Sequence, residues 1–256
     1  MDDRPQQGAT ASPAEDTSGA RPVLLIRKLR LVLDQFAPER PALTLRQIEA
    51  GTGLSHGTCA RLVQNLVAEG FLERSGRTYR AGLHLLHWGA AATAGLDLAA
   101  KAQPVLERLR DTTGEAATLY VPHGGVRVCL AVAQSRQEVV VRQIAPGRIM
   151  PLAAGSAGRV LLAFTGAPPP SDPAFTTQLE QVRRDGYFVS LGETDPGVSS
   201  ISAPVFDARG EVAALSIVAP TERVTGDGFE ARIAAVRAAA EQLSRALGGA
   251  APVSRG

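Results

Sequence analysis

Apolar residues in the first third of the chain recur at spacings of three and four, a pattern typical of amphipathic helices. A first helix is predicted over residues 24–36, and Pro38 and Pro41 should end it. Its apolar positions are Leu25, Leu29, Val32, Leu33 and Phe36. This helix should form the back of a small helical core.

Two shorter helices, separated by a glycine-bearing turn, are predicted over residues 44–66. Thr44 is a good N-cap for the first of them, because its hydroxyl can accept a free backbone N–H. Gly51 and Gly53 should then break the helix and allow a tight turn, and Ser55 should cap the second helix. The apolar positions are Leu45 and Ile48 in the first helix and Cys59, Leu62, Val63 and Leu66 in the second.

A β-hairpin should follow the second of these helices, which ends at Glu69-Gly70. Two short extended runs, residues 71–74 and 77–80, flank the turn signal Ser75-Gly76. A helix-turn-helix followed by such a hairpin is the pattern of a winged helix-turn-helix domain.

The polar face of the helix that starts at Ser55 has the character of a DNA-reading surface. The residues off its apolar stripe are His56, Gly57, Thr58, Arg61 and Gln64. A helix with a buried back and a small, polar, basic front suits the major groove of DNA. The hairpin carries Arg74, Arg77 and Arg80, which can neutralise phosphates without reading sequence. The alternative is an ordinary helical hairpin with a solvated front.

The rest of the chain predicts helices at both ends of a sheet, an α+β domain. Helices are expected over residues 83–92, 97–113, 152–164 and 174–185, and near the C-terminus. Strands are expected over residues 116–121, 126–132, 139–144, 187–190, 198–206 and 212–218. Turns are expected at residues 122–125 and 207–210. The last helix should be capped by Thr225 or Asp227, with Phe229, Ile233, Val236, Leu243 and Leu247 on its apolar face.

Two features of this second part could bind a ligand. The helix over residues 152–164 starts in a loop of very small residues, and its N-terminus could hold an anion. Close packing of helix on sheet explains the same residues. Ser200, Ser202 and Ser216 place hydroxyls among apolar strand positions, where they need hydrogen-bond partners. A polar ligand or backbone carbonyls could supply them.

Charge is unevenly distributed along the chain. Residues 21–82 carry ten basic and five acidic side chains, whereas residues 83–256 carry sixteen of each. A nucleic-acid reader attached to a neutral module should show this asymmetry, although chance clustering also produces it. Residues 1–20 are polar and lack the apolar core of a secretory signal, so a disordered tail is expected.

Other classes of protein find little support in the sequence. No apolar run reaches membrane-spanning length, and Cys59 and Cys129 form no disulfide framework, which favours a cytoplasmic protein. His84 and His87 are three apart, but no carboxylate or cysteine at ligand spacing completes a metal site. An enzyme could use only Cys129 with His123, and Cys129 should be a buried, inert strand residue. We therefore expect no metal, no cofactor and no catalytic activity.

The order of short motifs resembles that of IclR-type transcriptional regulators, over residues 21–249. These motifs are residues 43–48, 52–55, 58, 61–62, 66–72, 79–82, 154–158, 183–187, 197–205 and 213–216. The resemblance implies a winged helix-turn-helix joined by a linker helix to a GAF-like antiparallel-sheet effector domain. The corresponding segments are a disordered tail over 1–20, the DNA-binding domain over 21–82, the linker helix over 83–96, the effector domain over 97–249 and a disordered tail over 250–256.

The resemblance also implies partners and site residues. The protein should bind a pseudo-palindromic operator in double-stranded DNA as a dimer or tetramer, act as a repressor, and respond to a small organic or aromatic acid. Expected DNA-binding residues are Thr44, Arg46, Gln47, Ser55, His56, Gly57, Thr58, Arg61, Arg74 and Arg77. Expected effector-binding residues are Leu152, Ala154, Ser156, Ala157, Val198, Ser200 and Ser216.

Several positions depart from the usual residues of this family. They are His56, Gly57 and Ala60 in the DNA-reading helix and Ala153, Arg159 and Ser200 in the effector domain. The operator and the effector therefore stay open. A regulator that ignores ligands because side chains fill its pocket is an alternative, and an enzyme using the C-terminal domain is a more remote one.

Overall fold

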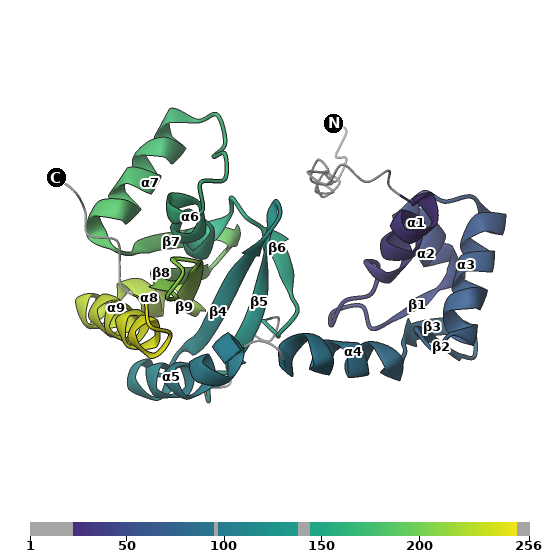
Figure 1. The fold of residues 1–256 in the computed structure, drawn as a ribbon, viewed down its shortest axis with the longest axis horizontal. Coiled ribbons are helices and arrows are strands. Elements are labelled where there is room, and N and C mark those ends of the chain that lie inside the picture. Colours follow the sequence, from purple (N-terminus) through teal and green to yellow (C-terminus); the bar gives the residue numbers. More distant parts are fainter. Residues whose placement is uncertain (1–22, 95–96, 138–143, 250–256) are drawn as a thin grey trace, which may run out of the picture. The chain divides into compact units, whose positions relative to one another are not determined.

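A computed structural model describes residues 23–94, 97–137 and 144–249, and the chain divides into two compact units at residue 97 (Figure 1). The tails expected over 1–20 and 250–256 lie outside the described residues, as does nearly all of the strand expected over 139–144. Ile144, the last residue of that strand, is described and is buried. Among the described residues, every helix is too short or too polar to traverse a lipid bilayer.

The N-terminal unit consists of helices around a small three-stranded sheet. Its elements are α1 (Leu24–Leu33), β1 (Ala42–Thr44), α2 (Leu45–Thr52), α3 (His56–Ala68), β2 (Leu72–Ser75), β3 (Thr78–Ala81) and α4 (Leu83–Ala94). Its buried core is Val32, Leu43, Ile48, Cys59, Leu62, Val63, Leu66 and Leu72. The whole apolar stripe predicted for α3 is part of this core, because spacings of three and four place those residues on one face.

The predicted helix ends in this unit need correction. Helix α1 ends at Leu33, before Phe36, and Leu25 is exposed instead of packing in the core. Gly51 does not break α2; the helix runs through it, and Gly53 alone adopts the left-handed conformation that ends the helix. A glycine is favoured at such a cap because it has no side chain to clash at positive φ.

The predicted hairpin is present, but it belongs to a larger sheet. Strand β3 pairs with β2 on one side and with β1 on the other, and β1 was not predicted. The turn consists of Gly76 and Arg77 instead of Ser75 and Gly76, since Ser75 pairs with Thr78. Arg77 therefore lies at the tip of the wing.

The C-terminal unit is an antiparallel sheet with helices on both faces. Its helices are α5 (Asp97–Thr113), α6 (Gly155–Phe164), α7 (Pro173–Asp185), α8 (Thr221–Thr225) and α9 (Phe229–Ala246). Its strands are β4 (Ala116–His123), β5 (Val126–Ala133), β6 (Ile149–Pro151), β7 (Phe188–Asp195), β8 (Val198–Phe206) and β9 (Val212–Pro220). The strand order is β6-β5-β4-β9-β8-β7, so the first and second hairpins meet through β4 and β9. Mixed helix and antiparallel sheet confirms the predicted α+β class.

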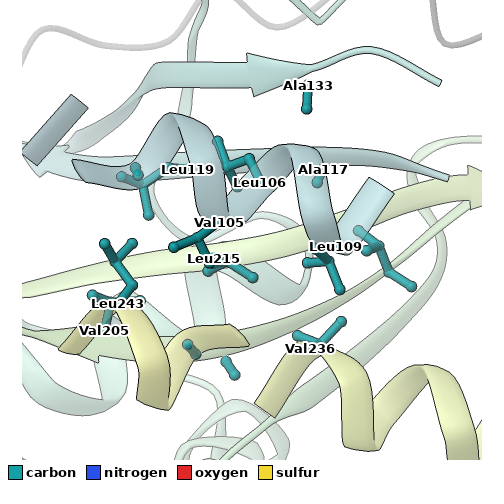
Figure 2. Packing of buried hydrophobic residues seen from close by; sticks show 14 of the residues in the cluster. Val105, Leu106, Leu109, Ala117, Leu119, Ala133, Val205, Leu215, Val236 and Leu243 are labelled. Atoms are coloured by element: carbon teal, nitrogen blue, oxygen red, sulfur yellow. The ribbon is translucent and has the colours of Figure 1, made fainter. Parts of the chain in front are cut away.

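Alternation along the central strands sends side chains to two separate cores. Helices α5 and α9 pack on one face, where Leu106, Leu119, Leu215 and Leu243 belong to one buried cluster (Figure 2). Helices α6 and α7 pack on the opposite face, where Tyr120 belongs to the other cluster. Leu119 and Tyr120 are neighbours in β4 and enter different cores because successive strand residues point to opposite faces.

The predicted boundaries of the second unit need several changes. The helix predicted over 97–113 has the predicted ends. Pro122 and His123 continue strand β4 instead of forming the turn, and β7 is longer than predicted. Strand β6 and helix α8 were not predicted. Neither Thr225 nor Asp227 caps α9; the cap position is Gly228, without a side-chain hydrogen bond.

Candidate nucleic-acid interface and effector site

The start of α2 is fixed by a reciprocal capping box. The Thr44 hydroxyl accepts from the Gln47 backbone N–H at 3.4 Å, and Gln47 Oε1 accepts from the Thr44 backbone N–H at 2.8 Å. The predicted cap is therefore confirmed, and two expected DNA-binding side chains also hold α2 in place. Arg46 lies beside them and is exposed.

The front of α3 is open to solvent along its predicted polar face. His56, Gly57 and Arg61 are exposed, and Thr58 is half-buried. Ser55 occupies the cap position, but its hydroxyl donates to Thr58 Oγ1 at 3.1 Å instead of accepting a backbone N–H. Within the described part of the chain, the Arg61 guanidinium has no hydrogen-bond or ion-pair partner. Its charge is available to a ligand outside the protein.

Among the described residues, His56 is the residue on this front that contacts a carboxylate. His56 Nδ1 lies 2.7 Å from Glu49 Oε1, although 77% of the His56 side chain is exposed. Glu49 comes from α2, so this contact joins the two helices of the motif across their turn. The sequence pattern did not reveal the pair, because it joins different helices.

The three wing arginines differ in availability. Arg80 makes an ion pair with Glu73 at 2.6 Å, and the hydrogen bond from Arg80 lowers the pKa of that carboxyl. Arg74 donates to the Gly76 carbonyl at 3.0 Å. Arg77, at the tip, is exposed and has no partner among the described residues. Arg80 is thus engaged within the wing, and Arg77 is the arginine best placed to meet a phosphate.

The N-terminus of α6 has free backbone donors in a buried setting. The N–H groups of Gly155, Ser156 and Ala157 have no acceptor among the described residues, and all three residues are buried. No side chain caps this helix at Ala154. The first N–H groups of a helix have no acceptor within the helix, so these three can donate to a group from outside it.

A buried arginine contacts the carbonyls of this loop. Arg127, on β5, is 3% exposed and donates through Nη1 to the carbonyls of Pro151, at 2.7 Å, and Ala154. Its guanidinium also lies 5.2 Å from the centroid of the Tyr120 ring, and its Nε has no partner in the described part of the chain. Burial lowers the pKa of Arg127. Among the described residues, no carboxylate forms an ion pair with this buried charge, although Glu193 attracts it from a longer distance.

A second buried arginine differs because its charge is balanced. Arg159, on α6, pairs with Glu193 at 2.8 Å and donates to Gln178 Oε1 at 2.8 Å. It also donates to the carbonyl of Ala153, and its guanidinium lies 4.2 Å from the centroid of the Phe175 ring. Both arginines thus hold carbonyls of the loop that precedes α6.

The candidate serines form a buried chain of hydroxyls. Ser156 Oγ lies 2.6 Å from both Ser200 Oγ and Ser202 Oγ, and Ser202 Oγ lies 2.7 Å from Ser216 Oγ. The serines bond one another, a source of partners that the sequence did not suggest. Thr118 lies opposite Ser216 in the sheet, and within the described part of the chain its buried hydroxyl has no partner at hydrogen-bonding geometry.

The other expected effector residues surround this chain. Leu152 and Ala157 are buried in the cluster under α6, and Val198 packs against it half-buried. Ala154 is half-buried at the start of the helix. The structure thus brings the seven expected residues to one end of α6. The sequence analysis did not identify Arg127 as a site residue. A signal was present, because Arg127 is two positions from the buried Cys129 in the same strand and therefore points to the same face of the sheet.

The alternative chemistries have weak geometric support. Cys129 is buried, and burial raises the pKa of its thiol to about 12, while His123 is exposed at the end of β4. His84 Nδ1 lies 3.0 Å from the Glu69 carbonyl oxygen. Among the residues that the structure describes, no group of three histidine, cysteine or acidic side chains is arranged to hold a metal ion.

Comparison with known proteins covers both units. Residues 26–76 match the model described as the IclR helix-turn-helix domain, and residues 90–168 and 170–245 match the model described as the bacterial transcriptional regulator IclR C-terminal domain. The HTH-type transcriptional regulator BhcR of Paracoccus denitrificans is 31% identical over 94% of this chain and 92% of its own length. The HTH-type transcriptional repressor AllR of Salmonella paratyphi A is 29% identical over 82% of this chain and 85% of its own. A crystal structure of an IclR homologue complexed with 4-hydroxybenzoate, from Microbacterium hydrocarbonoxydans, matches with a TM-score of 0.71 at 26% identity, over 87% of this chain and 99% of that one.

Proposed function

The chain belongs to the IclR family of bacterial transcriptional regulators, and from that premise we propose that it is a cytoplasmic, DNA-binding repressor controlled by a small organic acid. The observation that carries the proposal is the open front of α3, whose exposed Arg61 has no partner in the described part of the chain. An exposed, unpaired arginine on the second helix of a helix-turn-helix motif suits base or phosphate contacts in the major groove.

The proposed DNA-binding domain is residues 21–82, with α4 within the linker segment over 83–96. Thr58 and Arg61 contact bases or phosphates, and Arg77 contacts the backbone from the wing. The other proposed contacts come from the start of α2, the start of α3 and the wing: Thr44, Arg46, Gln47, Ser55, His56, Gly57 and Arg74. Two such domains in a dimer would require a pseudo-palindromic operator.

Self-association is supported by apolar side chains that the N-terminal unit leaves in solvent. The exposed large hydrophobic residues of this unit are Val23, Leu24, Leu25 and Ile26 near the start of α1 and Leu83, Leu86 and Trp88 on α4. Exposed apolar groups in such number mark interaction surfaces in soluble proteins. We propose that α1 and α4 contribute to contacts between protomers of a dimer or tetramer.

The proposed effector domain, residues 97–249, would take a monoanionic acid. Arg127 and Arg159 together carry two positive charges, and Glu193, which pairs directly with Arg159, is the carboxylate that acts on both. The three free N–H groups at the start of α6 supply donors beside Arg127. A carboxylate would satisfy both, since buried charges need partners and helix N-termini favour anions.

The hydroxyl chain offers the same ligand one further donor. Four hydroxyl oxygens joined by three hydrogen bonds leave one O–H unused, and it can lie on any of the four serines because either atom of each pair can be the donor. Ser200 is half-buried, whereas Ser216 is buried, so an acceptor on the ligand can reach the Ser200 end. Ser200 and Ser156 are therefore the proposed hydroxyl contacts, within the apolar wall made by Leu152, Ala154, Ala157 and Val198.

One observation favours a second candidate, a repressor that ignores ligands. Arg127 and Arg159 hold the loop carbonyls, and the serines bond among themselves, so the site is internally satisfied except at the groups named above. A ligand would have to compete with these contacts. It regulates DNA binding only if it prefers one arrangement of the protein over another.

Two experiments test the proposal. Sequencing of genomic fragments bound by the purified full-length chain should return one pseudo-palindromic motif; recovery of fragments without a common motif would refute specific DNA binding.

In a thermal-shift screen, a simple organic acid such as 4-hydroxybenzoate should raise the melting temperature of the protein, because a ligand that binds the folded state stabilises it. The variant Arg127→Met should lose that shift, whereas Arg136→Met, which removes an exposed arginine elsewhere in the same unit, should keep it. No shift with any acid would favour the ligand-independent repressor.

A further inference from the structure

His56 is the first residue of the proposed recognition helix, and it has only one polar atom left for DNA. Its Nδ1 lies 2.7 Å from Glu49 Oε1, and most of its side chain is exposed. A carboxylate accepts hydrogen bonds and donates none when ionised, so Nδ1 must carry the proton of this contact. Nε2 is the remaining ring nitrogen, and nothing in the described part of the chain contacts it.

The Glu49 contact therefore decides what Nε2 can do. In the neutral ring, the proton on Nδ1 leaves Nε2 with a lone pair, so Nε2 is an acceptor. In the protonated ring, Nε2 also carries a proton and becomes a donor. The second ring nitrogen thus changes role with the charge of the ring, while the first keeps its bond to Glu49.

Glu49 is well placed to hold the ring in both charge states. Its side chain is 21% exposed and comes from α2, which is anchored by the capping box at Thr44. The charged and titratable groups on the two helices around it are Arg46 and Glu49 on α2 and Cys59 and Arg61 on α3. Cys59 is buried beneath the front, and neither arginine bonds the imidazole.

Different bases in the major groove pair with Nε2 as an acceptor and with Nε2 as a donor. Cytosine presents only the N4 amino donor there, whereas guanine presents only the O6 and N7 acceptors. A neutral His56 therefore suits cytosine, and a protonated His56 suits guanine. Adenine, which offers both an N6 donor and an N7 acceptor, discriminates less.

On the basis of the proposed DNA-binding function, we infer that His56 reads one base pair in each half-site through Nε2, and that Glu49 fixes the tautomer so that the reading changes with the charge of the ring. The preferred base on the contacted strand is cytosine when the ring is neutral and guanine when it is charged. First-turn residues of recognition helices contact base edges, which places His56 where such a reading occurs.

The test compares operators that differ at a single pair. After the bound motif is known, His56→Ala identifies the position at which base preference is relaxed. Affinities of the full-length chain for the C·G and G·C versions of that position are then measured at about pH 8 and about pH 5.5, on either side of the usual range for histidine. We expect a preference of about fivefold for cytosine at the higher pH, the size of one net hydrogen bond, and a preference for guanine at the lower.

Three variants separate this reading from a structural role. In Glu49→Gln the side-chain amide can donate to Nδ1 as well as accept from it, so the ring is no longer restricted to one tautomer, and the preference at the higher pH should fall below about twofold. Glu69→Gln removes the same charge at the other end of α3 and should keep the full preference. His56→Gln, which does not titrate, should bind with the same preference at both pH values.

The outcomes are distinguishable from failure of the proposed function. Enrichment of no motif by the wild-type chain would remove the DNA-binding proposal and this inference together. A clear motif with no position relaxed in His56→Ala would overturn the inference alone. A pH effect that weakens both operators equally would also overturn it, because His56 would then contact phosphate instead of a base edge.

Discussion

Replacing Ser202 with alanine should break the buried hydroxyl chain at its centre. Ser202 bonds both Ser156 and Ser216, and Ser156 keeps a second partner in Ser200. Ser216 has no other partner among the described residues and is 1% exposed, so Ser202→Ala leaves its hydroxyl buried and unsatisfied. Most of the lost stability therefore comes from the unsatisfied hydroxyl of Ser216, which is not itself mutated.

The expected magnitudes follow from the number of bonds and orphaned groups. Ser202→Ala loses two bonds and orphans one hydroxyl, which should lower the free energy of unfolding by about 2–4 kcal/mol. Ser216→Ala loses one bond and leaves Ser202 bonded to Ser156, a cost of about 1 kcal/mol. The double variant removes both ends of one bond and orphans nothing, so it should cost only about 1–2 kcal/mol. Adding Ser216→Ala to Ser202→Ala should thus recover part of the stability that Ser202→Ala loses.

Equilibrium urea unfolding of the full-length chain measures this cycle. Trp88 is the single tryptophan and lies in the N-terminal unit, so its fluorescence follows that unit. Far-UV circular dichroism follows both units. The part of its change that occurs at urea concentrations where the fluorescence is constant therefore reports unfolding of the C-terminal unit. A double variant destabilised by the sum of the two single effects would refute the reasoning, because it would show that the hydroxyls have independent partners.

Three further predictions concern other parts of the molecule. Arg61→Ala should weaken operator binding by about 1–3 kcal/mol if Arg61 reads a guanine, and an unchanged gel-shift titration would count against that contact. Thr44→Ala should lower the free energy of unfolding of the N-terminal unit by about 1 kcal/mol, measured by Trp88 fluorescence in urea; no change would mean that the capping box contributes nothing. Burial raises the pKa of Cys129 to about 12 from an ordinary 9.0, so the folded state holds the thiol proton more tightly. The resulting stabilisation is complete below about pH 9 and declines as the pH rises toward 12, so Cys129→Ala should flatten the alkaline fall of the melting temperature; equal slopes would contradict this.

The sequence by itself determined the elements whose cause is local. The stripe of α3, from Cys59 to Leu66, is buried as its spacing predicts, because residues three and four apart share a helix face wherever the helix lies. The Thr44 cap involves a residue only three positions away. The class of fold followed in the same way, from alternating runs, turn residues and amphipathic helices.

Only the tertiary structure decided which polar groups far apart in the sequence meet. Arg127 bonds carbonyls 24 and 27 residues away, and Ser156 bonds serines 44 and 46 residues away. Glu49 and His56 meet because a turn folds one helix back on the other. Such partners depend on strand order and helix packing, in which β4 lies beside β9, and no periodicity in the chain encodes that order. The apolar pattern therefore specified which residues are buried. The polar contacts in each site depend instead on bringing together residues that are distant in the sequence, and the pattern does not encode those contacts.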